Sequence, residues 1–446
     1  MFSWYVGWQQ GLLWQRVARG AGWLLGGNAL ATVLTAVRAL ILANLLGATQ
    51  YGTLGLIIAA GALFTRLVEF RSGEAVVKYV SHFLAQGQTT PATAVTKATM
   101  LIDLAGSLAS YLLMVITAPL AATYLTHDPA NVPLIRLYAL TLLLAAPSGT
   151  AVALLRLSNQ YSQLAAQDAG VALLQLVGSV AILWAGGSLP HLILFLVIAA
   201  AIQSGLHLWL WRQAARTLHL PPWHTAPLHL LREQQQEIGR FLLATNLTGT
   251  LKGVQTNLDT LLIGFWLGPT ITGYYRLARN AAQLFAFPVN PLYQVAYPEF
   301  VRLWPQPQQL RRFFWQMVLL SGGFGVVAGT AVSLTAPWLI RTFLNPSYLA
   351  ALPVFNLLLI GIIIILASQY LHALLLAGGR AAPTAWGYAV GVAAQIIVLL
   401  VTLPSIGLIG AGYAFITFAA TRALWLAWAG RDAKSCVSTP SQHFLS

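Results

Sequence analysis

The sequence LGATQYG at residues 46–52 returns as LGPTITG at residues 267–273, 221 residues further along the chain. Each copy stands between two long apolar stretches, where glycine commonly interrupts a regular element. Other matches keep this offset or nearly so: Thr35 with Thr256, Gly170-Val171-Ala172 with Gly391-Val392-Ala393, and Thr117-Ala118-Pro119 with Thr335-Ala336-Pro337. Their common order predicts two related halves that are repeated in parallel.

The composition is that of an integral membrane protein. Hydrophobic residues make up 58% of the 446 residues and charged residues only 8%, whereas about 25% is usual in soluble domains. So few charges cannot cover a surface that faces water, so most of the surface must face lipid. The 15 Trp and 15 Tyr suit the two levels where a membrane meets water.

Apolar stretches long enough to cross a membrane, about 20 residues each, set the domain organisation. We predict an all-α integral membrane protein with about twelve transmembrane helices in two homologous six-helix lobes. The predicted domains are an interfacial segment (1–20), an N-lobe (21–214), a cytoplasmic linker (215–239), a C-lobe (240–430) and a cytoplasmic tail (431–446). The predicted spans are 21–46, 51–70, 99–125, 133–155, 164–185, 190–211, 240–267, 272–300, 314–344, 350–377, 384–403 and 408–429.

The net charge of +14 does not indicate nucleic-acid binding, because the Lys and Arg residues stand singly between apolar runs. With a cytoplasmic N-terminus, the predicted outer side holds only Arg136 and Arg341, at span ends, against sixteen Lys and Arg residues on the cytoplasmic side. Such an asymmetry is typical of multi-pass proteins and predicts that both termini are cytoplasmic. We therefore expect a multi-pass protein of the bacterial inner membrane, in contact with membrane lipids.

Charged and polar residues inside the spans are the candidate functional residues, because each charge there costs about 2.5–3.5 kcal/mol on insertion scales. Spacings of three and four place polar side chains on one face of the first and seventh spans. These two stripes are expected to face a cavity between the lobes. They consist of Asn28, Thr32, Thr35 and Arg38 in the first span, and Thr245, Thr248, Lys252, Thr256 and Asp259 in the seventh.

The candidate substrate-binding residues are expected to bind an anion, because fixed cations offset part of the desolvation of a phosphate. The alternatives are structural: Arg38 and Asp259 pair with each other, Lys252 meets backbone carbonyls or water, and Arg276 and Arg279 reach toward the interface. The candidates are Arg38, Lys252, Asn28, Thr35, Thr256, Arg66, Arg276 and Arg279.

Asp259 and Asp168 are candidates for coupling transport to a proton or to sodium, because a desolvated carboxylate can exchange protons. Asp103 is a further candidate, although ion pairs and hydrogen bonds within each lobe are the favoured explanation for Asp103 and Asp168. No metal or cofactor is expected: the single cysteine, Cys436, lies in the tail, and the histidines of the linker lack the spacing of metal ligands.

Several motifs resemble one transporter family. The resemblance rests on NLDTLLIG at 257–264, LGP at 267–269, GYY at 273–275, LA at 277–278, YPE at 297–299, LGATQYG at 46–52, VVKYV at 76–80 and LLR at 154–156. They resemble the polysaccharide-transport (O-antigen flippase) branch of the multidrug/oligosaccharidyl-lipid/polysaccharide exporter superfamily, while FRSGE at 70–74 departs from it by its charges. The resemblance implies a V-shaped, two-lobed flippase that moves an undecaprenyl-diphosphate-linked anionic oligosaccharide by alternating access, in lipopolysaccharide or related synthesis, beside a glycan polymerase.

Two other functions fit the same class of protein. A multidrug or cation antiporter would need an anionic cavity, but the cations within the spans outnumber the acids: Arg38, Arg66, Lys252, Arg276, Arg279 and Arg422 against Asp103, Asp168 and Asp259. A membrane-embedded polysaccharide polymerase or ligase would need catalytic groups on a substantial outer loop. The longest predicted outer loop, near 126–132, offers only His127 and Asp128. A transporter of an anionic substrate therefore fits best.

Overall fold

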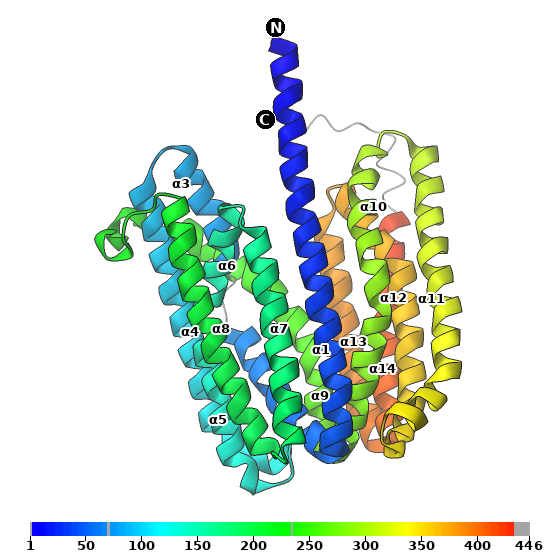
Figure 1. Ribbon diagram of the computed structural model, residues 1–446. Coiled ribbons are helices and arrows are strands. Elements are labelled where there is room, and N and C mark those ends of the chain that lie inside the picture. Colours follow the sequence, from blue (N-terminus) through cyan, green and yellow to red (C-terminus); the bar gives the residue numbers. More distant parts are fainter. Residues whose placement is uncertain (1, 69–71, 233–234, 432–446) are drawn as a thin grey trace. The chain divides into compact units, whose positions relative to one another are not determined.

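The computed structural model describes residues 2–68, 72–232 and 235–431, and within these ranges every regular element is a helix (Figure 1). Nine helices in this part of the chain are long and apolar enough to cross a membrane. The prediction of an all-α integral membrane protein is therefore confirmed. The side chains of residues 1–25 and the tail after Arg431 lie outside the described part, so the interfacial segment and the tail stay predictions.

The first compact unit comprises residues 1–46 and 57–257. Its helices α4, α5, α7 and α8 lie side by side in Figure 1, with α5 packed against both α4 and α8. Its elements are most of α1 (Phe2–Val68), α2 (Ser72–Ala75), the π-helix η1 (Val76–Val80), α3 (Ser81–Ala85), α4 (Thr89–Tyr124), η2 (Pro129–Asn131), α5 (Val132–Leu144), α6 (Ser148–Leu157), α7 (Tyr161–Trp184), α8 (Leu189–Thr217), η3 (Trp223–Thr225), η4 (Leu228–Leu231) and the first part of α9 (Gln235–Ala286).

The second compact unit comprises residues 47–56 and 258–446. Helix α14 packs closely against both α12 and α13. The elements of this unit are the rest of α9, η5 (Phe287–Val289), α10 (Asn290–Arg302), α11 (Pro307–Phe343), η6 (Pro346–Ala351), α12 (Leu352–Ala377), α13 (Ala381–Ile406) and α14 (Leu408–Arg431).

The described parts of the twelve predicted spans fall largely on helical segments, and residues 69 and 70 of the second span lie outside the described part. The first two share α1, which is kinked at Gly47, and the seventh and much of the eighth share α9, which is kinked at Gly268. The fourth span is broken before α6, where Pro147 precedes the first residue. That twelve segments cross the membrane, and that the domains end where the sequence places them, stay predictions.

The two copies of the repeated sequence lie against each other inside the second unit. We call residues 46–52 and 267–273 the turn pair. Gly47 has φ 72° and ψ 170°, and its equivalent Gly268 has φ 78° and ψ 177°. This left-handed φ region is open to glycine at little steric cost. The hydroxyls of the equivalent residues Thr49 and Thr270 are 2.8 Å apart and hydrogen-bonded.

The contact within the turn pair is reciprocal. A Cβ added to Gly52 would overlap the carbonyl of Pro269, and a Cβ added to Gly273 would overlap the carbonyl of Ala48. Gly52 is equivalent to Gly273 in the repeat, and Ala48 to Pro269. Glycine at both places lets the two backbones approach closely, as small residues do between packed membrane helices.

We expect Gly273→Ala to destabilise the protein by about 1–3 kcal/mol, because the new methyl group meets backbone that cannot move aside. Gly323→Ala is the matched control, because a Cβ there meets no atom within 4 Å. Thermal unfolding of the purified proteins in detergent measures the difference. Equal stability of the two variants would show that the close approach is unnecessary.

Candidate functional site

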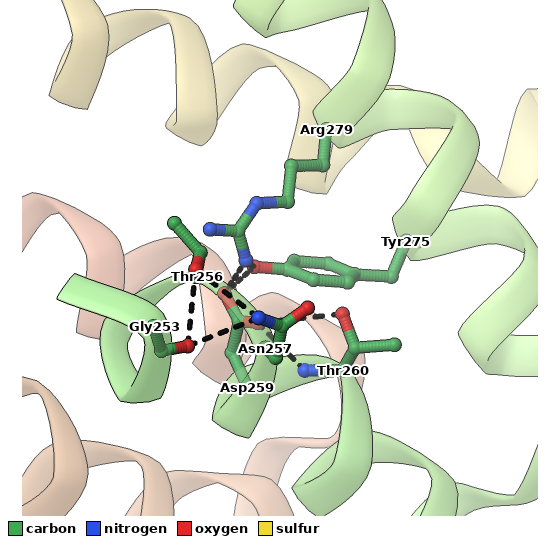
Figure 2. Close-up of polar contacts among 7 residues, drawn as sticks. All are labelled: Gly253, Thr256, Asn257, Asp259, Thr260, Tyr275 and Arg279. Carbon is green, nitrogen blue, oxygen red and sulfur yellow. Dashed lines mark hydrogen bonds and ion pairs between the residues drawn. The ribbon is translucent and has the colours of Figure 1, made fainter. Parts of the chain in front are cut away.

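Asp259 is the most buried charged group among the described residues of the candidate site. Its side chain is 1% exposed, and Arg279 donates to its Oδ2 atom in an ion pair (Figure 2). The Tyr275 hydroxyl also donates to Oδ2, over 2.5 Å, and the Thr260 amide donates to Oδ1 over 2.7 Å. The carboxylate thus accepts from three residues, two of which lie on α9 beyond the Gly268 kink. Tyr275 and Arg279 are four residues apart and therefore share a helix face.

This geometry bears on the two roles that the sequence left open for Asp259. Its ion pair is with Arg279 and replaces the suggested pair with Arg38. Coupling a proton or sodium through Asp259 stays a prediction, and such a step would first have to displace Arg279 from the carboxylate. The buried pair also has a structural role, because either charge alone would be strongly disfavoured in the interior.

Arg276 is one turn before Asn280 on α9, and it lies in the second unit beside Tyr51. Its guanidinium carbon is 5.8 Å from the centroid of the Tyr51 ring, within the range of a cation–π contact. Asn280 donates to the Tyr51 hydroxyl over 3.1 Å. The Arg276 side chain fills the space beside Gly55, the residue that is equivalent to Arg276 in the repeat. A Cβ on Gly55 would overlap the Arg276 side chain. Its Nη1 atom is buried and has no hydrogen-bond partner within the described residues.

In the first unit, Arg38 of α1 donates to the side-chain oxygen of Gln175 on α7. The guanidinium is therefore fixed against a neighbouring helix. Asn28 and Thr35 are exposed on the same helix. Thr32, between them, uses its hydroxyl to bond the Asn28 carbonyl over 2.7 Å.

Arg66 and Thr256, two further candidates, meet at Gly253 on α9. A Cβ on Gly253 would overlap the Arg66 stem, and the Thr256 hydroxyl donates to the Gly253 carbonyl over 3.0 Å. The side chain of the preceding residue, Lys252, lies outside the described part of the structure. Spacing by three predicts a common face for Thr256 and Asp259, yet Thr256 is exposed and Asp259 is buried.

The two remaining acids of the spans have different surroundings. Asp103 of α4 accepts from the Thr150 amide (3.2 Å) and hydroxyl (2.8 Å), so it caps the first turn of α6 after the break at Pro147. This is a structural hydrogen bond within one unit, as one reading of the sequence predicts. Asp168 of α7 is partly buried, and its carboxylate forms no hydrogen bond or ion pair in the described ranges.

Lys78 and Glu237 form an ion pair that the sequence did not indicate. The Lys78 Nζ is 3.0 Å from Glu237 Oε1, and the Tyr79 hydroxyl donates to the same oxygen over 2.9 Å. The hydrogen bond from Lys78 lowers the pKa of Glu237, and it raises the pKa of Lys78 in turn. The lowered acid pKa keeps the contact charged until pH falls well below neutrality, and the raised pKa of Lys78 keeps it charged on the alkaline side. The pair ties η1 to the first turn of α9.

The overall fold matches solved transporter structures. An inward-facing multidrug resistance MATE transporter of the MOP superfamily gives a TM-score of 0.73 at 11% identity, covering 93% of this chain and 96% of that one. The lipid II flippase MurJ, in an inward closed conformation, gives 0.71 at 12% identity, covering 92% and 87%. At these identities the likeness shows a shared fold and nothing further.

The sequence comparisons show the family to which this chain belongs. The family model described as "Polysaccharide biosynthesis protein" matches residues 17–304. The chain therefore belongs to the polysaccharide biosynthesis protein family. The inner membrane protein YghQ of Escherichia coli K12 is 22% identical over 338 residues, which cover 75% of this chain and 94% of that protein. The teichuronic acid biosynthesis protein TuaB of Bacillus subtilis 168 is 28% identical over 193 residues, which cover 42% and 38%.

The family model confirms the family that the motifs suggested. The chain is a multi-pass inner-membrane protein. Sequence reasoning missed the contacts of Tyr51, Tyr275 and Asn280. The Gly268-Pro269 break was the available signal for the Asp259–Arg279 pair, since it lets α9 fold back on itself.

We expect Arg279→Met to lower stability by about 3–5 kcal/mol, because it leaves the Asp259 carboxylate buried without its cation. Adding Asp259→Leu should restore most of that loss, since two apolar side chains can replace a buried pair. Lys78→Met is the control, because it breaks an exposed pair that contributes little. Thermal unfolding in detergent is the measurement. A double variant no more stable than Arg279→Met alone would contradict the pairing.

Proposed function

We propose that this protein is a flippase that translocates an undecaprenyl-diphosphate-linked oligosaccharide, a polysaccharide or O-antigen repeat unit, across the inner membrane by alternating access. Family membership in polysaccharide biosynthesis supports this proposal, and so does a fold shared with a lipid II flippase. The observation that carries it is Arg276, a cation held over an aromatic ring with a buried donor that no described group accepts from.

The proposed ligand explains such a donor. A diphosphate that leaves the headgroup region loses hydration, and fixed guanidinium groups recover part of that loss through charge-assisted hydrogen bonds. An unused buried donor is itself unfavourable, so its retention favours a ligand that supplies the missing acceptor. Arg38, Arg66, Lys252, Asn28, Thr35 and Thr256 complete the proposed binding set. Arg279 would contribute only while it is released from Asp259.

Asp168 is the proposed coupling group for a proton or sodium, with Asp259 as the alternative. Asp168 has a carboxylate that no described donor occupies, whereas Asp259 is already bonded by Arg279, Tyr275 and Thr260. The cytoplasmic position of both termini and a polymerase that receives the glycan belong to the same proposal. A multidrug or cation antiporter is the less favoured function, because two of the three acids in the spans are already bonded within their units.

A strain that lacks the gene for this protein and carries a variant copy tests the proposal. Arg276→Ala, Arg38→Ala and Lys252→Ala should each reduce polysaccharide export at least about tenfold, the equivalent of about 1.4 kcal/mol of lost interaction. Arg276→Lys should recover only part of the export, because an ammonium group lacks the planar fork of donors. Asp168→Asn should lose the ion dependence of transport in vesicles made from the purified protein.

Arg341→Ala is the control, because this arginine is exposed near the end of α11. Immunoblots of the membrane fraction show whether each variant is made in normal amount. Normal export by the Arg276, Arg38 and Lys252 variants, at normal protein levels, would rule out the cation site.

A further inference from the structure

Arg422 is a cation within a span to which the proposed function gives no role. It lies on α14, is partly buried, and places its guanidinium carbon 6.0 Å from the centroid of the Tyr388 ring on α13. Tyr293 of α10 is the other ionisable group close enough to interact with it electrostatically. No hydrogen bond or ion pair joins Arg422 to any described residue. Three helices of the second unit therefore surround a guanidinium whose donors remain available.

The described acids of the second unit already have basic partners. Three of the ten acidic residues of the sequence belong to this unit, namely Asp259, Glu299 and Asp432, and Asp432 lies outside the described residues. Asp259 is paired with Arg279, and Glu299 lies 3.6 Å from Arg302 on the same helix. No acid among the described residues of this unit is therefore left to balance Arg422.

Tyr388 interacts electrostatically with Arg422 and also with Arg279, whose charge Asp259 already balances. Tyrosine suits such a place because its ring face attracts cations while its hydroxyl can donate to an anion. Charges buried in a membrane protein are normally compensated by a partner of opposite sign. Among the described residues, no group of opposite charge pairs with Arg422, so its partner has to come from outside the protein.

We propose that the second unit holds an exchangeable anion at Arg422, beside Tyr388 and Tyr293. The ligand class is a small oxyanion or halide, such as phosphate or chloride, and the phosphate of a lipid headgroup offers the same chemistry. An ion requirement of this unit would then concern an anion rather than sodium or a proton. This inference goes beyond the flippase proposal and does not depend on it.

Thermal unfolding of the purified protein in detergent tests the site without any transport. Replacing gluconate with chloride or phosphate, at constant sodium concentration, should raise the melting temperature by several degrees. This rise should saturate as the anion concentration increases, as binding to one site requires. Arg422→Gln should abolish this shift, and Tyr388→Phe should weaken it by removing the hydroxyl. Arg341→Gln, a change of the same chemistry at an exposed position, should leave it intact.

A second comparison keeps the test decisive if Arg422→Gln folds poorly. The unaltered protein is melted in sodium gluconate, choline chloride and choline gluconate, and stabilisation by chloride without sodium is expected. Stabilisation that follows sodium alone would overturn the proposal. In a further experiment, undecaprenyl phosphate is added to the protein in detergent micelles with gluconate as the anion. A shift that only this lipid causes, and that requires Arg422, assigns the anion to a lipid headgroup. No shift from chloride, phosphate or lipid contradicts the site.

Discussion

The close approach of the two repeated turns is the constraint on which the rest of the structure depends. Gly52 and Gly273 each leave space for a carbonyl of the other copy, and Thr49 and Thr270 bond across the pair. Because of this contact, residues 47–56 of the first half belong to the second compact unit. The chain therefore passes between the units within α1 and again within α9.

The second organising feature is that several of the few acidic residues are bonded within the protein. Asp259 balances Arg279, Asp103 caps α6, and Glu237 binds Lys78 and Tyr79. These three acids are therefore occupied within the protein. Arg276 is held by a ring and Arg38 bonds an amide. A chain that binds cationic drugs would need the opposite arrangement, with acids held by neutral groups.

The sequence predicted the features that depend on composition and period. Apolar length located the helices, and the recurring LG-x-T motif located both kinks, because only a glycine readily takes their positive φ. The helices run beyond the predicted spans, as α4 does by beginning at Thr89, since apolarity marks only the part that lies in lipid.

The candidate site was less accessible to sequence reasoning. The helical spacing of polar residues can be analysed only within one span at a time. It therefore predicted that Asp259 and Thr256 lie on one polar stripe. It could not foresee that Arg279, twenty residues later, returns to the carboxylate across the Gly268 kink. The contact of Arg276 with Tyr51 joins the two halves of the sequence, and the place of Arg422 depends on the packing of α10, α13 and α14. Neither has a signal in local spacing.

Binding of lipid diphosphate to the purified protein tests the central claim most directly. Native mass spectrometry can compare undecaprenyl diphosphate, undecaprenyl phosphate and the uncharged alcohol on the unaltered protein and on Arg276→Ala. A site built from unbalanced guanidinium groups should prefer the diphosphate to the alcohol by at least about tenfold, and Arg276→Ala should remove most of that preference. Equal binding of all three lipids, or a preference that survives the loss of Arg276, would contradict the account.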